Sequence, residues 1–154
     1  MLRIAVIFES SPFDRKGLFN AVHNRVKHLA ASGKCEVDVF CVHSRDNALT
    51  RRLRHTPEVE VTDEVVIDDI RYSLMWYRFS IFDHLTVNKL HLRPFFFSWF
   101  MDRAVRVLEG YDRIVAHSFT GGLLAKAAFK RYGVPYFVTF FEVVQIAVVP
   151  MSMG

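Results

Sequence analysis

The sequence predicts a single Rossmann-like α/β domain, in which helices flank a mostly parallel sheet. Apolar runs of strand length alternate with segments whose apolar residues recur at helical spacing, and short turns join the two kinds of segment. The clearest unit spans residues 111–140 and has the pattern of a strand, a helix and a second strand. Such alternation favours parallel strands joined by right-handed crossovers. Ligands are therefore expected at the carboxyl ends of the strands.

The first elements follow from apolar spacing. Residues 2–8 form a near-continuous apolar run, typical of a central parallel strand. A helix is predicted next, because apolar residues recur at helical spacing until Gly33 closes the segment. These apolar residues are Leu18, Val22, Val26 and Leu29, which leaves Asn20, His23, Asn24 and Lys27 on other faces. Residues 36–42, rich in β-branched side chains, predict the second strand.

The middle of the chain is less regular. Residues 48–60 are charged and poorly patterned, and predict a helical or irregular surface excursion. Residues 64–67 and 70–77 predict a strand and an extended aromatic segment, with a hairpin turn at Asp68 and Asp69.

Two further helices are predicted. Residues 95–108 carry aromatic and aliphatic side chains at near-helical spacing, including Trp99. After the strand at residues 114–116, a helix runs to Gly133, which stops it before Pro135 leads into the next strand.

Length and composition indicate one domain with a core of its own. The chain has 154 residues, of which 51% are hydrophobic, so disulfides are not needed for stability. Alternation places Cys35 and Cys41 on the same face of a strand but too far apart to bridge. We expect a buried, reduced pair rather than metal or redox chemistry, because no other cysteine completes a CxxC spacing. No metal or cofactor is predicted.

The charge is modestly basic, with a formal net charge of +4 and a pI of about 9.3. This balance suits an anionic ligand or an anionic membrane surface without requiring either. Basic residues cluster at Arg45, Arg51, Arg52 and Arg54, and again at Arg71, Arg78, Lys89 and Arg93. No nucleic-acid module accompanies them, so no nucleic-acid partner is expected. The first strand begins at once, without a signal peptide, and the cytoplasm is the expected compartment.

The loop after the first strand is one candidate site. Residues 9–17, ESSPFDRKG, offer hydroxyls such as that of Ser10, a flexible Gly17 and the amides of the following helix. Such a set can hold a phosphate or a sugar hydroxyl. The loop is neither a Walker motif nor GxGxxG, and an ordinary connecting loop stays open as the alternative.

The elbow of residues 117–122, HSFTGG, is the second candidate site. It supplies His117, Ser118 and Thr120 where a strand ends, followed by Gly121 and Gly122, which let the backbone approach a ligand closely. A Ser–His hydrolase is disfavoured, because neighbouring residues on an extended chain point to opposite sides and GxSxG is absent. Without other information, His117 is more often a structural histidine than a catalytic one.

The stretch IVAHSFTGGLLAKAAFKRYGVPYFVTF resembles the N-terminal domain of family-four retaining glycosyltransferases, which have the GT-B fold. The resemblance covers residues 2–140 and is most specific over residues 114–140. It implies transfer of a sugar from a nucleotide-sugar donor to a polysaccharide or glycolipid acceptor. By the same resemblance, Gly17 lies near the donor phosphates and His117 faces the cleft as a catalytic residue. Ser10, Ser118, Thr120 and Gly121 are the expected substrate-binding residues.

The sequence also departs from the family pattern. Where the family continues His-Gly-Ser-Asp after the last predicted strand, this chain has Phe141, Glu142, Val143 and Val144. The family binds its donor mainly through a C-terminal Rossmann domain, which these residues do not contain. We therefore expect a polypeptide of residues 1–154 to show no transferase turnover by itself, and a separate donor-binding domain is a predicted partner.

Residues 141–154 are set apart as an atypical apolar tail, which gives a domain boundary after residue 140. Residues 134–154 hold one charged residue, Glu142, yet the part left after the predicted strand is too short to span a membrane. A truncated, frameshifted or engineered end would produce the same pattern.

Two alternatives to the transferase stay open. One is a non-catalytic interaction or regulatory module, which the lost His-Gly-Ser-Asp turn favours. The other is a peripheral module at the inner membrane face, using residues 93–100, RPFFFSWF, where aromatic side chains lie beside an arginine. A helix buried against the sheet explains the same aromatic residues.

Overall fold

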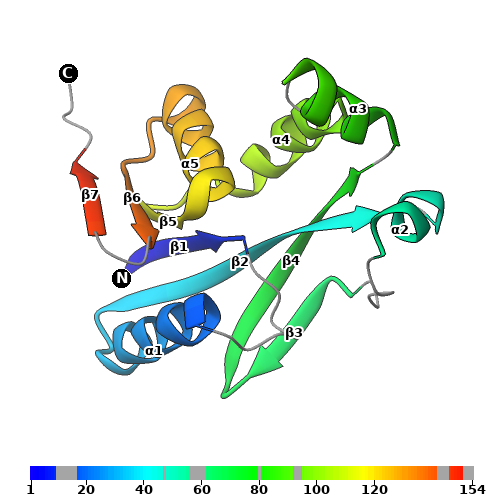
Figure 1. The fold of residues 1–154 in the computed structure, drawn as a ribbon. Coiled ribbons are helices and arrows are strands. Elements are labelled where there is room, and N and C mark those ends of the chain that lie inside the picture. The colour runs from blue at the N-terminus through cyan, green and yellow to red at the C-terminus, as the bar shows by residue number, and fades with distance from the viewer. Residues whose placement is uncertain are drawn as a thin grey trace.

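The computed structural model describes residues 1–9, 17–46, 48–55, 62–79, 81–91, 95–141 and 146–150. Within them, seven strands form one sheet in the order β3-β4-β2-β1-β5-β6-β7 (Figure 1). The strands are β1 (Leu2–Phe8), β2 (Cys35–Asp46), β3 (Glu64–Ile67), β4 (Ile70–Phe79), β5 (Arg113–His117), β6 (Tyr136–Phe141) and β7 (Ile146–Pro150). The helices are α1 (Gly17–Ala31), α2 (Ala48–Arg54), α3 (Ile81–Leu90), α4 (Phe95–Val107) and α5 (Ser118–Tyr132).

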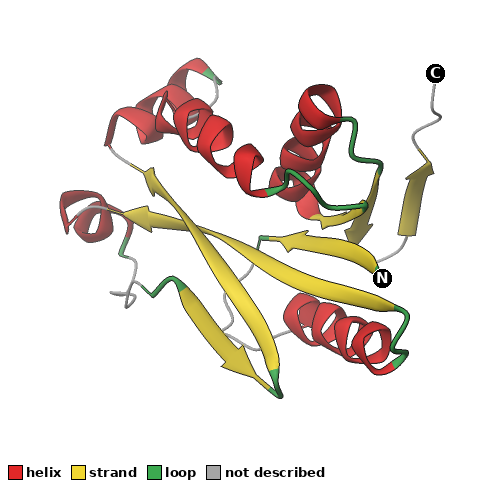
Figure 2. Ribbon diagram, turned by 180° about the vertical axis from the view of Figure 1, so that it is seen from behind, coloured by secondary structure: helices red, strands yellow, loops and turns green. Residues whose placement is uncertain are grey.

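The sheet confirms the predicted α/β class. Strands β4, β2, β1, β5 and β6 are parallel, whereas β3 and β7 pair antiparallel at the two edges. Helix α1 covers one face, and α4 and α5 cover the other (Figures 1 and 2). From β1 the chain adds β2, β3 and β4 on one side of that strand. It then returns through α3 and α4 to β5, which lies on the other side of β1. The topological switch point therefore lies between β1 and β5, where ligands bind in folds of this kind.

Strand β1 divides its side chains between two cores, as a central parallel strand must. Ile4, Val6 and Phe8 pack into the core beneath α1. Ala5 and Ile7 pack into the core beneath α4 and α5. The continuous apolar run of this strand thus reflects burial on both faces.

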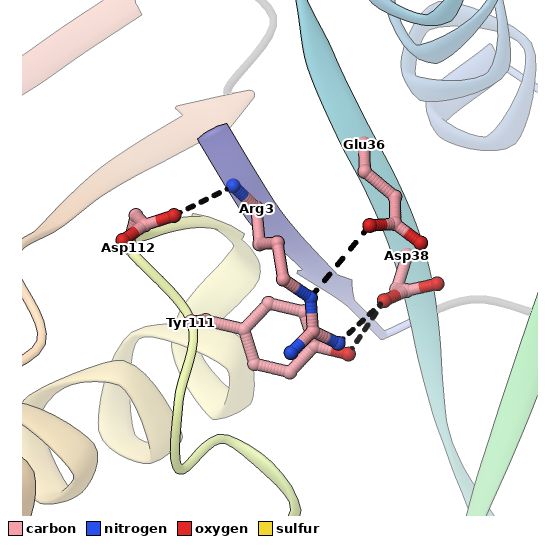
Figure 3. A network of polar contacts seen from close by, with 5 residues as sticks. All are labelled: Arg3, Glu36, Asp38, Tyr111 and Asp112. Carbon is pink, nitrogen blue, oxygen red and sulfur yellow. Dashed lines mark hydrogen bonds and ion pairs between the residues drawn. The ribbon is translucent and has the colours of Figure 1, made fainter. Parts of the chain in front are cut away.

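A polar network ties the amino-terminal edge of the sheet to the loop before β5 (Figure 3). The backbone N–H of Arg3 donates to Asp112 Oδ2 at 2.7 Å, and Tyr111 donates its hydroxyl to Asp38 Oδ2 at 2.7 Å. The Arg3 guanidinium lies 4.7 Å from the centroid of the Tyr111 ring and 3.7 Å from Asp38 Oδ2. Burial and the Asp38 hydrogen bond raise the pKa of Tyr111, so this hydroxyl stays protonated. The network fixes the edge opposite the expected ligand site.

The placement of His23 extends the sequence prediction. Its position in the helical pattern puts it on a different face from the apolar residues, yet the structure buries it too, between α1 and the β3–β4 hairpin. Nδ1 hydrogen-bonds to the Tyr72 hydroxyl, Nε2 lies 2.8 Å from Asp68 Oδ2, and the ring stacks on Phe19. A polar ring can be buried here because both of its nitrogens have partners.

Replacing His23 with leucine should destabilise the fold by about 2 kcal/mol, because both hydrogen bonds between α1 and the hairpin are lost. Urea unfolding followed by circular dichroism measures this. His28→Leu, an exposed change on the same helix, is the control. In a double-mutant cycle with Tyr72→Phe the two changes should couple by about 1 kcal/mol, and strict additivity would contradict the hydrogen bond.

Several other predictions are confirmed. The hairpin turns at Asp68 and Asp69, both with positive φ, 50° and 62°. Cys35 and Cys41 are buried and free, and burial raises the pKa of Cys41 to about 12, which keeps its thiol protonated and unreactive. Gly133 ends α5 with φ 72°, its N–H donating to the Phe129 carbonyl. None of the described helices is long and apolar enough to cross a membrane.

Three predictions need correction or extension. Strand β2 continues past residue 42 to Asp46, because its end pairs with β4 and His43 packs on Trp76. Helix α3 has no counterpart in the sequence prediction, since its apolar residues follow no helical stripe. Trp99 is 77% exposed, although α4 does pack on the sheet through Phe100.

The tail and the charged excursion are only partly described. Phe141 belongs to β6, and residues 146–150 of the predicted tail join the sheet as β7. Residues 48–54 of the surface excursion form α2, whereas residues 56–61 lie outside the described residues.

Candidate functional site

The carboxyl ends of β1, β5 and β6 meet beside the switch point. The register pairs Ile7 of β1 with Ala116 of β5, and His117 of β5 with Thr139 of β6. Phe8, the last residue of β1, is therefore level with His117, and the predicted loop site and the predicted elbow share one edge of the sheet.

His117 is the centre of this edge. As the last residue of β5 it points toward the α1 face, since Ala116 before it packs into the opposite core. The side chain is only 1% exposed, and Nδ1 hydrogen-bonds to Thr139 Oγ1. The Thr139 hydroxyl also lies 3.5 Å from the Ala116 carbonyl, to which it donates. The tautomer of His117 that fits this donation carries the imidazole proton on Nδ1 and has Nε2 as an acceptor, an assignment made from the hydrogen-bond network.

The surroundings of His117 keep it neutral. Burial lowers its pKa to about 4, and the positive charge of Arg25 on α1 acts in the same direction. At neutral pH the ring is therefore an uncharged imidazole with a basic nitrogen rather than a cation. Such a ring can accept a hydrogen bond from a hydroxyl group of a substrate.

Ser118 makes the turn from strand to helix in a single residue. Its φ is 73°, a left-handed conformation that is unusual outside glycine and costs about 1–3 kcal/mol. Its Oγ is buried and has no hydrogen-bond partner among the described residues. The preceding residue, His117, provides no side-chain cap for α5. Strain and an unsatisfied hydroxyl thus coincide at the first residue of the helix.

The glycines of the elbow have a packing role. A Cβ on Gly121 would lie 3.1 Å from the Ile7 carbonyl oxygen, and one on Gly122 would lie 3.2 Å from Val138 Cγ1. Both glycines therefore let α5 approach the sheet closely. Thr120 is also buried in this first turn. A contact of Thr120 or Gly121 with substrate stays a prediction.

Of the loop after β1, only its first and last residues, Glu9 and Gly17, are among the described residues. Ser10 lies outside the described residues. Gly17 is the exposed first residue of α1, and no heavy atom of the described part of the chain lies within 4 Å of its Cβ position. The place of Gly17 near the donor phosphates stays a prediction. The structure brings His117, Ser118 and Thr120 to the edge beside the end of β1.

Sequence reasoning missed two residues of this site. Thr139 is recognised as part of the site only once the register of β5 and β6 is known. Strand alternation does place it on the side opposite Val138, which is the side that His117 faces. Arg25 has no sequence signal, because it lies on a flank of α1 whose distance from His117 depends on how the helix packs.

A Rossmann-like sheet with a buried histidine at the carboxyl end of β5 has the arrangement expected of the N-terminal domain of a GT-B glycosyltransferase. Residues 16–151 match the family described as Glycosyl transferase 4-like domain, and the chain belongs to this family. The match extends past the predicted boundary at residue 140 and includes β7. The resemblance noted in the sequence is thereby confirmed.

A solved structure supports the same fold. The chain is similar to sucrose-phosphate synthase from Thermosynechococcus elongatus, with a TM-score of 0.53 and 14% sequence identity. The similarity covers 93% of this chain and 34% of that chain, so the chain spans about a third of the synthase's length. Comparison with curated protein sequences finds no match.

Proposed function

We propose that this chain forms the acceptor-side half of a retaining glycosyltransferase, which transfers a sugar from a nucleotide-sugar donor to a polysaccharide or glycolipid acceptor. The family match over residues 16–151 supports the general class. The observation that carries the role of the site is His117, buried, neutral and held by Thr139 at the carboxyl end of β5.

In this proposal His117 is the catalytic residue of the half-site. Its Nε2 accepts a hydrogen bond from a sugar hydroxyl, while Thr139 fixes the ring. The Ser118 hydroxyl, which lacks a partner among the described residues, supplies a further polar contact. Ser10, Gly17, Thr120 and Gly121 complete the proposed substrate-binding set. A donor-binding domain provides the groups that stabilise the leaving diphosphate.

Ligand binding to the 154-residue chain tests the half-site directly. Glycan acceptors and nucleotide sugars are titrated into isotope-labelled protein, and the backbone and imidazole signals are followed by NMR. We expect a glycan acceptor to shift the signals of His117, Ser118 and Thr139, and His117→Gln to weaken its binding by about tenfold or more, as expected for a lost hydrogen bond. His28→Gln is the matched control on an exposed histidine. Shifts confined to other parts of the sheet would contradict the site.

The same chain should show no multiple-turnover consumption of any nucleotide sugar by itself, because one domain does not assemble both sides of the cleft. Donor consumption that disappears in His117→Ala would overturn this expectation and place the complete active site within these residues. A pull-down that recovers a donor-binding subunit would instead support a split enzyme.

A non-catalytic interaction module is the second candidate. The chain has Phe141 and Glu142 where the family pattern has the His-Gly of a polar turn, and this substitution favours loss of transfer activity. In this case the His117 signals would remain unchanged with every glycan and every nucleotide sugar.

A further inference from the structure

Apolar side chains are exposed at the corner of the sheet where β2 and β4 end. Asp46 pairs with Phe79 at the last step of these strands, α2 begins two residues after Asp46, and α3 begins two residues after Phe79. The two helices therefore leave the sheet from one corner, at the carboxyl ends of the strands. Figure 1 shows α2 and α3 beyond the ends of β2 and β4.

Helix α2 exposes apolar and basic side chains on one side. Leu49 and Leu53 are one turn apart and 56% and 58% exposed, and Arg52 lies between them on the same side of the helix. No acidic residue occurs in α2.

Helix α3 likewise exposes apolar side chains beside a basic one. Phe82 and Leu85 are 69% and 48% exposed, and Lys89 lies one turn further on the same side of the helix. The helix packs against α4 and still leaves these side chains in solvent. Its one acidic residue, Asp83, is completely buried. The charge that α2 and α3 present is therefore basic.

Helix α4 adds an aromatic side chain from the neighbouring element. Trp99 is exposed, and Arg103 follows it one turn later on the same side. Its sequence neighbour Phe100 is buried, so α4 satisfies its packing against the sheet without Trp99. Tryptophan beside arginine or lysine is the combination favoured at the boundary between lipid headgroups and acyl chains.

We propose that this corner, formed by α2, α3 and the exposed side of α4, is a docking surface for an anionic lipid bilayer. The apolar residues Leu49, Leu53, Phe82, Leu85 and Trp99 insert at the headgroup boundary, and Arg52, Lys89 and Arg103 contact lipid phosphates. Apolar insertion and electrostatic attraction together give reversible peripheral binding, which neither provides alone. The inference differs from the segment suggested by sequence, residues 93–100, and does not depend on the proposed transferase activity.

Vesicle flotation tests the surface with the 154-residue chain. Vesicles of phosphatidylcholine alone are compared with vesicles containing one third phosphatidylglycerol, at low and at high salt. We expect binding to the anionic vesicles at low salt, weakened at high salt, and little binding to phosphatidylcholine. Absence of binding to anionic vesicles at low salt overturns the proposal, as does equal binding to both compositions. Salt-sensitive self-association in place of vesicle binding would assign the corner to a protein partner and equally overturn it.

Matched variants locate the binding. Arg52→Glu with Lys89→Glu should lower the partition coefficient by about tenfold or more. Lys34→Glu with Lys126→Glu changes the net charge equally at exposed positions outside α2, α3 and α4, and should change the partition coefficient by less than about twofold if docking is local. Leu53→Ser with Phe82→Ser should also lower binding by about tenfold, whereas Val66→Ser, an exposed change near the opposite end of β4, should not. Equal losses in the control variants would overturn the location. Circular dichroism confirms that each variant is folded.

Discussion

Replacing Gly121 with valine should destabilise the domain by about 3 kcal/mol, the largest loss expected from a single change at the site. A Cβ at this position would lie 3.1 Å from the carbonyl oxygen of Ile7 and 3.5 Å from Ala116 Cβ. The Ile7 carbonyl belongs to β1, the central strand, whose backbone is held by β2 on one side and β5 on the other. It cannot move without disturbing the sheet, so α5 must shift outward as a whole.

A comparison of alanine variants isolates this effect. Alanine at either glycine of α5 gains about 1 kcal/mol of helix propensity. At Gly122 the new Cβ meets the side chain of Val138 at 3.2 Å, which can rotate or shift, whereas at Gly121 it meets backbone. Gly122→Ala should therefore be the more stable of the two in urea unfolding.

This measurement also bears on the role of Gly121 in the predicted site. A glycine kept only for close approach of a ligand would tolerate valine without loss of stability in the unliganded chain. Wild-type stability in Gly121→Val would contradict the packing role and favour ligand approach. Gly17→Ala provides the reference, because no heavy atom of the described residues lies within 4 Å of its Cβ position.

The sequence predicted those parts of the fold in which one local pattern decides the structure. The apolar run of β1 is buried on both faces, and Gly133 ends α5 with a positive φ, so burial and backbone geometry agree with local sequence. Helix α3 lacks the signal that predicts a helix, because its apolar residues form no amphipathic stripe, and Phe82, Leu85 and Leu90 lie exposed.

In the candidate site, too, local sequence predicts some residues, whereas others depend on tertiary contacts. His117 was found because it ends an apolar strand and precedes glycines, which is a local signal. Its partner Thr139 is 22 residues away, and the hydrogen bond exists only through the register of β5 and β6. The burial of His23 is not predictable from the sequence for a similar reason, since the Tyr72 hydroxyl and the Asp68 carboxylate that permit it come from a distant hairpin. The burial of these polar groups is thus explained by hydrogen-bond partners that are distant in the sequence, and local periodicity does not reveal such partners.

Stability should fall by about 3 kcal/mol between pH 7 and pH 4 because of His117 alone. Its pKa is about 4 in the folded state, against 6.5 for the free side chain. The unfolded chain therefore binds this proton more readily, and acid favours unfolding. The loss begins as the pH falls below about 6.5, grows by about 1.4 kcal/mol for each pH step, and is complete near the folded pKa.

The variant His117→Asn removes this titration while retaining a side chain that can hydrogen-bond to Thr139. Urea unfolding at a series of pH values should show that the wild type loses about 3 kcal/mol more than the variant between pH 7 and pH 4. The hydrogen bond from His23 is the largest cause lowering the pKa of Asp68 below 3.8, so the stability gained from its ionised form is lost only at still lower pH. Asp68→Asn should therefore leave the slope between pH 6.5 and pH 4 unchanged. An imidazole of His117 that titrates near pH 6.5 by NMR would contradict both the buried neutral ring and its proposed role as a hydrogen-bond acceptor in the cleft.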